Sequence, residues 1–212
     1  MPLLIGNLRI DNLLILNKIF DKLINSFIDD KVGISENFLS TALSTSLKEN
    51  LNLLFLENKL RLAGIGNDLL INQDKKIRGD KVYWLDRKHE NVSENNFLDL
   101  IDLFVLHLNS TCYTGITGYE FHYAYYETGS FYKKHIDQFK NNASRQYTMI
   151  FYLNENWKRS DGGELCIHHT DKLQNISPKN GKSVFFKSSE VLHEVLTTNK
   201  ERFSITGWFK TN

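Results

Sequence analysis

Hydrophobic residues recur every three to four positions in the first half of the chain, which is the spacing of helices that bury one face. The clearest case covers residues 12–32, where leucine, isoleucine and phenylalanine are interspersed with asparagine, aspartate and lysine. A second helix is predicted over residues 35–59 with Ser35 as its N-cap, and a third follows Ser93. Between these two, IRGDKVYWL (77–85) predicts a short strand.

The pattern changes after Tyr119 to short runs of aromatic and β-branched residues, separated by glycine, asparagine and aspartate. The runs are YEFHYAYY, SFYKKHID, YTMIFYL, GELCIHH, KSVFFK and RFSITGWF. Such runs are typical of strands in an antiparallel sandwich or barrel. Because no repeat or linker separates the halves, we predict one α+β domain over residues 1–212. In it, a helical region with a few strands (1–118) supports a mainly β core (119–212).

Composition excludes several classes of protein. Lysine plus arginine (26) nearly equals aspartate plus glutamate (25), so overall charge gives no reason to expect a nucleic-acid partner or binding to an acidic membrane. Two cysteines are too few for a disulfide framework, and the first ten residues lack the features of a secretion signal. Polar residues interrupt every leucine-rich stretch. We therefore expect a cytoplasmic protein without a membrane span.

The strongest chemical signal is a possible metal-binding triad, His135, Asp137 and His193. His135 and Asp137 are separated by one residue in a predicted strand. Because side chains alternate along a strand with a period of two, both lie on the same face. His193, which follows the apolar run VFFK, is the natural third ligand. Two imidazoles and one carboxylate form the facial triad of non-haem iron(II) oxygenases. A His-x-Asp pair is also common by chance, so the spacing alone leaves a structural role open.

Arg202 strengthens the case for an oxygenase. It lies nine residues after His193, a separation that lets the chain turn and enter the next strand of a sandwich. Its guanidinium can bind a carboxylate through two hydrogen bonds and stays charged when partly buried. A dicarboxylic cosubstrate such as 2-oxoglutarate needs such an anchor. The alternative is a surface charge or ion pair, which the hydrophobic neighbours Phe203 and Ile205 disfavour.

Several segments keep a fixed order and spacing from Arg78 to Trp208. They are IRGDKVYWLD, YYETGSFYKKHID, R-x-x-T-x-I-x-YLN-x-x-W, DGGEL, HEV and R-x-x-I-T-x-W. In this order they resemble the prolyl 4-hydroxylase branch of the iron(II)- and 2-oxoglutarate-dependent dioxygenases. The resemblance is strongest to the hypoxia-inducible-factor prolyl hydroxylases and their bacterial relatives. About the first 70 residues match less clearly.

The resemblance implies roles for residues around the expected iron. The triad would bind the metal, and Arg202 would bind the 5-carboxylate of 2-oxoglutarate. Tyr152 is similar to a tyrosine that donates a hydrogen bond to the same carboxylate, Tyr126 to one that lines the cosubstrate pocket, and Thr206 to a residue close to iron and its water. Without the resemblance, each tyrosine is interpreted as a core residue with its hydroxyl at the rim.

The resemblance also implies roles at the entrance of the site. Trp208 would pack near the substrate, and Arg78 and Asp80 would help to position the substrate and a loop of about residues 84–95 that moves over a bound peptide. Taken alone, these residues equally fit a turn and a sandwich core. The other histidines are expected to be structural or surface groups, and the cysteines small buried residues: His89, His107, His122, His168, His169, Cys112 and Cys166.

The implied fold is a double-stranded β-helix, or jelly roll, buttressed by the N-terminal helices. The implied activity is hydroxylation of a prolyl residue of a protein to 4-hydroxyproline, with iron(II), 2-oxoglutarate, O2 and ascorbate as reductant. Bacterial relatives point to a cytosolic substrate such as elongation factor Tu. Three alternatives stay open: a hydroxylase of another residue, free amino acid or small molecule; a catalytically silent binding module; and a cupin-like barrel, which Arg202 disfavours.

Overall fold

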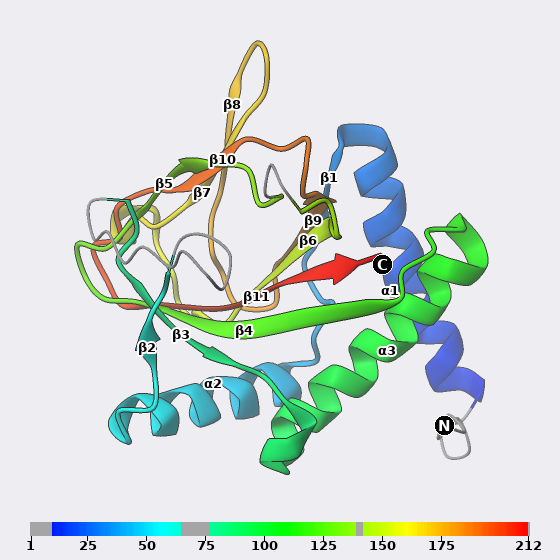
Figure 1. The fold of residues 1–212 in the computed structure, drawn as a ribbon, viewed down its shortest axis with the longest axis horizontal. Coiled ribbons are helices and arrows are strands. Elements are labelled where there is room, and N and C mark those ends of the chain that lie inside the picture. Colours follow the sequence, from blue (N-terminus) through cyan, green and yellow to red (C-terminus); the bar gives the residue numbers. More distant parts are fainter. Residues whose placement is uncertain (1–9, 65–76, 139–141, 212) are drawn as a thin grey trace.

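The computed structural model describes residues 10–64, 77–138 and 142–211 (Figure 1). The helices of this part of the chain are α1 (Ile10–Asp30), α2 (Thr41–Leu56) and α3 (Val92–Cys112), with two short 3-10 helices, η1 (Arg87–His89) and η2 (Arg159–Asp161). The three long helices confirm the helical pattern of the first half of the chain. No helix within these ranges has the length and apolar character needed to cross a membrane.

The predicted start of the second helix was wrong. Ser40 is the N-cap of α2, because its hydroxyl accepts a hydrogen bond from the backbone N–H of Leu43 at 3.2 Å. Ser35 is buried at the end of strand β1 (Val32–Ser35). The sequence pattern did not separate this strand from the first helix, because α1 ends at Asp30 and only Lys31, with a left-handed φ of 61°, lies between them.

The strands form two antiparallel sheets in the described part of the chain. The larger sheet has the order β1-β9-β6-β11-β4-β3-β2, with β2 (Arg61–Leu62), β3 (Asp80–Trp84), β4 (Gly118–Tyr126), β6 (Arg145–Tyr152), β9 (Ser183–Lys187) and β11 (Arg202–Lys210). The smaller sheet has the order β5-β10-β7-β8, with β5 (Tyr132–His135), β7 (Leu165–His168), β8 (Leu173–Ile176) and β10 (His193–Val195). These sheets confirm the predicted, mainly β fold.

Each of the six predicted β runs contains a strand, and so does the run at residues 77–85. The strands that the sequence did not reveal are β1, β2, β8 and β10. They have two to four residues each, too few to show an alternating pattern. One of them, β10, begins with His193, which was expected only to follow an apolar strand.

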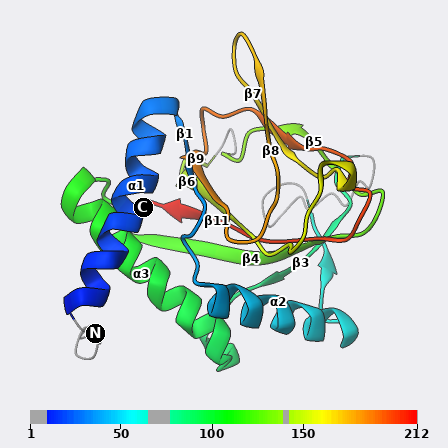
Figure 2. The same cartoon turned by 180° about the vertical axis from the view of Figure 1, so that it is seen from behind.

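The larger sheet separates two hydrophobic cores. On one face it packs against α1, α2 and α3, which lie together on that side in both views (Figures 1 and 2). On the other face it packs against the smaller sheet. We call the first the helix-side core, which includes Phe97, Phe104, Phe151, Ile205 and Phe209. The second is the inter-sheet core, which includes Tyr126, Tyr152, Leu165, Ile167 and Val184.

Candidate metal centre and its cavity

A cavity of about 690 Å³ opens between the two sheets. It is lined by nine of the ten residues that the sequence analysis singled out: His135, Asp137, His193, Arg202, Tyr126, Thr206, Arg78, Asp80 and Trp208. The tenth, Tyr152, is fully buried in the adjoining inter-sheet core. Residues up to 130 positions apart in the sequence are therefore collected around one space, the size of a pocket for a small organic ligand.

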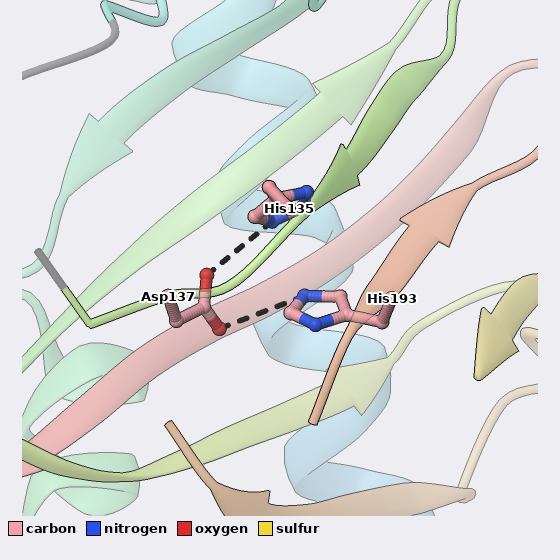
Figure 3. Close-up of side chains that lie close together, drawn as sticks. All are labelled: His135, Asp137 and His193. Atoms are coloured by element: carbon pink, nitrogen blue, oxygen red, sulfur yellow. Dashed lines mark ion pairs between the residues drawn. The ribbon is translucent and has the colours of Figure 1, made fainter. Parts of the chain in front are cut away.

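The triad converges on one point in this cavity (Figure 3). His135 Nε2 lies 3.3 Å from Asp137 Oδ1, and His193 Nε2 lies 3.6 Å from Asp137 Oδ2. Cross-strand pairing of β5 with β10 places His135 opposite His193. Asp137 follows the end of β5 in a bend, so strand alternation, on which the prediction rested, is not what brings it to His135.

Both imidazoles present Nε2 to the carboxylate. Nδ1 of His135 donates to the carbonyl of Lys133 at 2.7 Å, and Nδ1 of His193 donates to the carbonyl of Val191 at 3.0 Å. Because a carbonyl only accepts, the proton sits on Nδ1, and Nε2 of a neutral ring keeps its lone pair. Burial lowers the pKa of His193, which favours that neutral form. Two nitrogen lone pairs and a carboxylate then face one another, an arrangement that a cation would stabilise.

The carboxylate of Asp137 is held from behind by a buried pair of hydroxyls. Thr148 Oγ1 donates to Asp137 Oδ2 at 2.8 Å and lies 2.9 Å from Ser188 Oγ, which is also buried. Burial by itself would raise the pKa of Asp137, but the neighbouring His193 and His135 and the hydrogen bond from Thr148 keep that pKa well below its usual range. Asp137 is therefore an oriented carboxylate.

Arg202 is a buried cation that faces the same cavity. Its side chain is 1% exposed, and no acidic side chain in the described ranges forms an ion pair with it. Nε donates to the carbonyl of Gly163 at 2.9 Å and Nη1 to Ser204 Oγ at 3.3 Å, both uncharged acceptors. Gly163 has a left-handed φ of 65°, and a Cβ there would lie 3.1 Å from Cδ of Arg202. The glycine turn thus leaves room for the guanidinium.

Two tyrosines flank this guanidinium. Its Cζ lies 4.8 Å from the ring centre of Tyr126 and 5.1 Å from that of Tyr152. The hydroxyl of Tyr152 is buried without a hydrogen-bond partner among the described residues. Burial raises the pKa of Tyr152 to about 12, so this hydroxyl keeps its proton and can donate it. A buried cation and an unused donor are thus close together, and a bound carboxylate would satisfy both.

Arg78 and Asp80 line the cavity next to the smaller sheet. Nε and Nη2 of Arg78 donate to the two oxygens of Asp80 at 2.7 and 2.6 Å, while the guanidinium lies 4.3 Å from the ring centre of Tyr132. Tyr132 in turn stacks on His135 at 3.7 Å. The buried Asp80 carboxylate is therefore paired with Arg78. The Arg78 guanidinium in turn packs on the ring of Tyr132, which stacks on His135 of the triad.

Further aromatic and charged side chains line the same cavity. Trp208 is nearly buried, Trp84 is half exposed, and their ring centres lie 6.3 Å apart. His122, buried between them, was expected to be structural but lines the cavity, and burial lowers its pKa to about 4. Arg145 lies 3.4 Å from the ring centre of Trp208 and donates to Glu120 at 2.8 Å.

The sequence pattern did not assign these wall residues to the site. Glu120 and His122 on β4 and Trp84 on β3 lie on the face of the larger sheet that meets the cavity. Strand alternation combined with the placement of Tyr126 on the cavity would have revealed His122 and Glu120, at positions four and six residues before it.

In the loop at residues 84–95, Arg87 and His89 contact acidic residues of α3. Arg87 forms ion pairs with Asp99 at 2.7 Å and Asp102 at 2.6 Å on α3. His89 contacts the buried carboxylate of Glu94 at 2.9 Å. The predicted movement of this loop stays a prediction.

Comparison with known proteins agrees with this geometry. A family model, the 2OG-Fe(II) oxygenase superfamily, matches residues 121–210. The crystal structure of a Pseudomonas putida prolyl-4-hydroxylase superposes with a TM-score of 0.80 and 30% sequence identity, over 93% of this chain and all of that one. This chain belongs to the 2OG-Fe(II) oxygenase superfamily.

Two further relatives extend the comparison. Mouse prolyl hydroxylase EGLN3 is 28% identical over 182 residues, which cover 82% of this chain and 76% of the mouse protein. A Trichoplax adhaerens prolyl hydroxylase, solved with a peptide fragment of the hypoxia inducible factor oxygen degradation domain, has a TM-score of 0.85 at 24% identity, over 96% of this chain and 94% of that one. At that identity the likeness shows the fold, which is the predicted double-stranded β-helix.

Enzymes of the 2OG-Fe(II) oxygenase superfamily use iron(II), 2-oxoglutarate and O2. The residues of this chain fit that set of cofactors. Nitrogen and oxygen donors converge in the triad as iron(II) requires. Among the described residues, the buried guanidinium of Arg202 has no acidic partner and the nearby Tyr152 hydroxyl has no hydrogen-bond partner, so both are available to a dicarboxylate. The matched span of the superfamily model runs from β4 to β11 and so contains the triad, Arg202 and Tyr152, but none of α1, α2 and α3.

Proposed function

We propose that this chain hydroxylates a prolyl residue of a protein to 4-hydroxyproline, with release of succinate and carbon dioxide. When bound, iron(II) together with 2-oxoglutarate and O2 supplies an oxidant strong enough for an unactivated C–H bond. The observation that carries the proposal is the presence, in one cavity, of a two-histidine, one-carboxylate cluster and a buried arginine that forms no ion pair with an acidic residue of the described ranges.

In this proposal the triad binds iron(II). Hydrogen bonds from Nδ1 to backbone carbonyls hold both imidazoles, and Thr148 holds the carboxylate, so the three ligands are oriented before the metal arrives. Arg202 and Tyr152 bind the 5-carboxylate of 2-oxoglutarate. Tyr126 covers the guanidinium, and Thr206 contributes a hydroxyl to the cavity wall on the same strand as Arg202.

A prolyl substrate is supported by the relatives and by the wall of the cavity. Three of the proteins compared above are named as prolyl hydroxylases. Trp208, Trp84 and His122 give the cavity an aromatic wall, and the apolar ring of proline packs well against such a surface. We propose that Trp208 contacts the substrate, and that Arg78 and Asp80 position it by fixing Tyr132 and the segment beside β5.

The setting of the reaction belongs to the same proposal. We propose a cytoplasmic enzyme, since both cysteines are free thiols, with Cys112 exposed rather than buried as expected and Cys166 buried. Ascorbate is the proposed reductant that keeps the iron in its ferrous state. Elongation factor Tu, the cytosolic protein expected from the sequence resemblance, is the first substrate that we propose to test.

The test is to incubate the purified chain with iron(II), ascorbate and 2-oxoglutarate, and to measure succinate with and without proline-containing peptides, including peptides of elongation factor Tu. We expect succinate to rise with one peptide that gains the mass of one oxygen atom on a proline. The matched control replaces that proline by alanine. Absence of succinate, together with absence of metal-dependent 2-oxoglutarate binding, contradicts the enzyme assignment; succinate formed only with free amino acids contradicts the protein substrate.

A further inference from the structure

A second group of possible metal ligands lies on the smaller sheet, separate from the triad. It consists of Cys166 and His168 on β7 and Glu194 on β10, whose ligand atoms lie within 4.8 Å of one another. His168 Nε2 is 2.7 Å from Glu194 Oε1 and 3.9 Å from Cys166 Sγ. We call these three residues the outer cluster. The sequence analysis expects His168 to be a structural or surface group and Cys166 a small buried residue. The structure instead brings their ligand atoms together with that of Glu194.

The register of the sheet explains why the three side chains meet. Leu165 and Ile167 of β7 point into the inter-sheet core, so alternation places Cys166 and His168 on the opposite face. Cys166 pairs directly with Glu194 across the β7–β10 ladder. On β10 the same alternation sends Glu194 outward and its neighbour His193 inward to the cavity. The outer cluster and the triad therefore lie on opposite faces of the smaller sheet, and β10 contributes one residue to each.

The approach of the side chains distinguishes a metal site from a nucleophilic triad. In a thiol–imidazole–carboxylate relay, the thiol and the carboxylate contact different ring nitrogens. Here both Cys166 Sγ and Glu194 Oε1 approach the same atom, Nε2 of His168. Ligand atoms that converge on one point are what a metal ion needs. A simple His–Glu hydrogen bond would not require the thiol.

Burial and donor chemistry indicate which ion fits. Cys166 is 2% exposed, while the side chains of His168 and Glu194 are 15% and 27% exposed, so an ion can enter from solvent and keep a water ligand. A thiolate, an imidazole and a carboxylate are each ligands that zinc accepts, and the thiolate disfavours the hard cations Mg2+ and Ca2+. Burial and the nearby Glu194 raise the pKa of the Cys166 thiol, so the thiol stays protonated until a cation binds.

We propose that Cys166, His168 and Glu194 form a second divalent-metal site, selective for Zn2+ or the similar ion Co2+, on the outer face of the smaller sheet. The site is independent of the proposed hydroxylase activity. It differs from the triad by its thiolate, and this difference makes it observable.

The test is a titration of the purified chain with Co2+ under anaerobic, reducing conditions, followed by optical absorption. We expect a thiolate-to-cobalt charge-transfer band in the near ultraviolet, which the triad cannot produce because it has no sulfur ligand. Added Zn2+ should remove the band by displacing Co2+. The band should persist in Asp137→Ala, where the triad is disrupted. Absence of the band in the unmodified chain overturns the proposal.

Variants identify the ligands. Cys166→Ser should abolish the band, and the matched control Cys112→Ser, at the exposed cysteine, should retain it. Glu194→Gln, which keeps the size of the side chain, should weaken Co2+ binding by about tenfold or more with the far-ultraviolet circular dichroism unchanged. A band that survives in Cys166→Ser and disappears in Cys112→Ser would place the thiolate elsewhere and overturn the assignment, as would unchanged Co2+ affinity in Glu194→Gln.

Discussion

The two faces of strand β11 serve different purposes. Phe203, Ile205 and Phe209 point to the helix-side core, whereas Arg202, Thr206 and Trp208 point to the cavity. Neighbouring residues on one strand thus differ in environment: Ile205 is fully buried in hydrocarbon, and Thr206 is half-buried in a polar wall. The helix face of β11 therefore determines stability, and its cavity face, supported by the rigid core behind it, determines binding. Substitutions on the two faces should therefore change different measured quantities.

The largest effect is expected at the triad. Asp137→Asn keeps the volume of the side chain but removes the charge that attracts iron, so we expect turnover to fall by about 1,000-fold or more, equivalent to about 4 kcal/mol. Iron binding measured by calorimetry should weaken in parallel, with the melting temperature little changed. Full turnover in this variant would show that Asp137 is not a ligand.

The helix face should respond through stability alone. Ile205→Ala leaves a cavity in the helix-side core and should lower the free energy of unfolding by about 3 kcal/mol. Denaturant titration measures this loss, and Thr206→Ala on the opposite face is the matched control, expected to cost much less. If Ile205→Ala changed the KM for 2-oxoglutarate by more than about threefold, the separation of the two faces would be wrong.

The next effect concerns the buried cation. Arg202→Gln removes the charge that we assign to the cosubstrate carboxylate, so the KM for 2-oxoglutarate should rise by about 30-fold, or about 2 kcal/mol. The exposed Arg61→Gln is the control and should leave that KM unchanged. Steady-state kinetics with 2-oxoglutarate as the varied substrate decides the question; an unchanged KM in Arg202→Gln would remove the anchor from the account.

The smallest effect is expected behind the triad. Thr148→Val preserves shape but removes the hydrogen bond to Asp137 Oδ2, and the iron dissociation constant should rise by about tenfold, or about 1.4 kcal/mol. The partner variant Ser188→Ala should have a weaker effect in the same direction, since it acts through Thr148. Equal iron affinity in Thr148→Val and the unmodified chain would make this hydroxyl pair purely structural.

Much of this architecture could be predicted from the sequence because its signals are local. The spacing of His135 and Asp137 and the apolar neighbours of Arg202 identified residues that the structure collects in one cavity. The features that the sequence did not predict depend on pairing between strands that are far apart in the chain. Strand β10 is too short to show a pattern, and Ser35 was mistaken for an N-cap because its cross-strand partner, Ser183, lies 148 residues later.

The outer cluster shows the same limit. Cys166 and His168 are separated by one residue, as His135 and Asp137 are, but Glu194 becomes their neighbour only through the β7–β10 register. His122 differs, since alternation along β4 places it on the same face as Tyr126, and its position on the cavity follows once Tyr126 is assigned there. Contacts that depend on how strands pair are the ones that sequence spacing cannot supply.

The most direct test of the central claim is anaerobic optical titration of the iron(II)-loaded chain with 2-oxoglutarate. We expect a visible metal-to-ligand charge-transfer band that appears with 2-oxoglutarate, does not appear with succinate, and is lost in His193→Ala. The Arg202→Gln variant should reach the same band only at higher 2-oxoglutarate concentration. A chain that binds iron(II) but shows no band at any concentration of 2-oxoglutarate, or one whose band is unaffected by His193→Ala, would contradict the account.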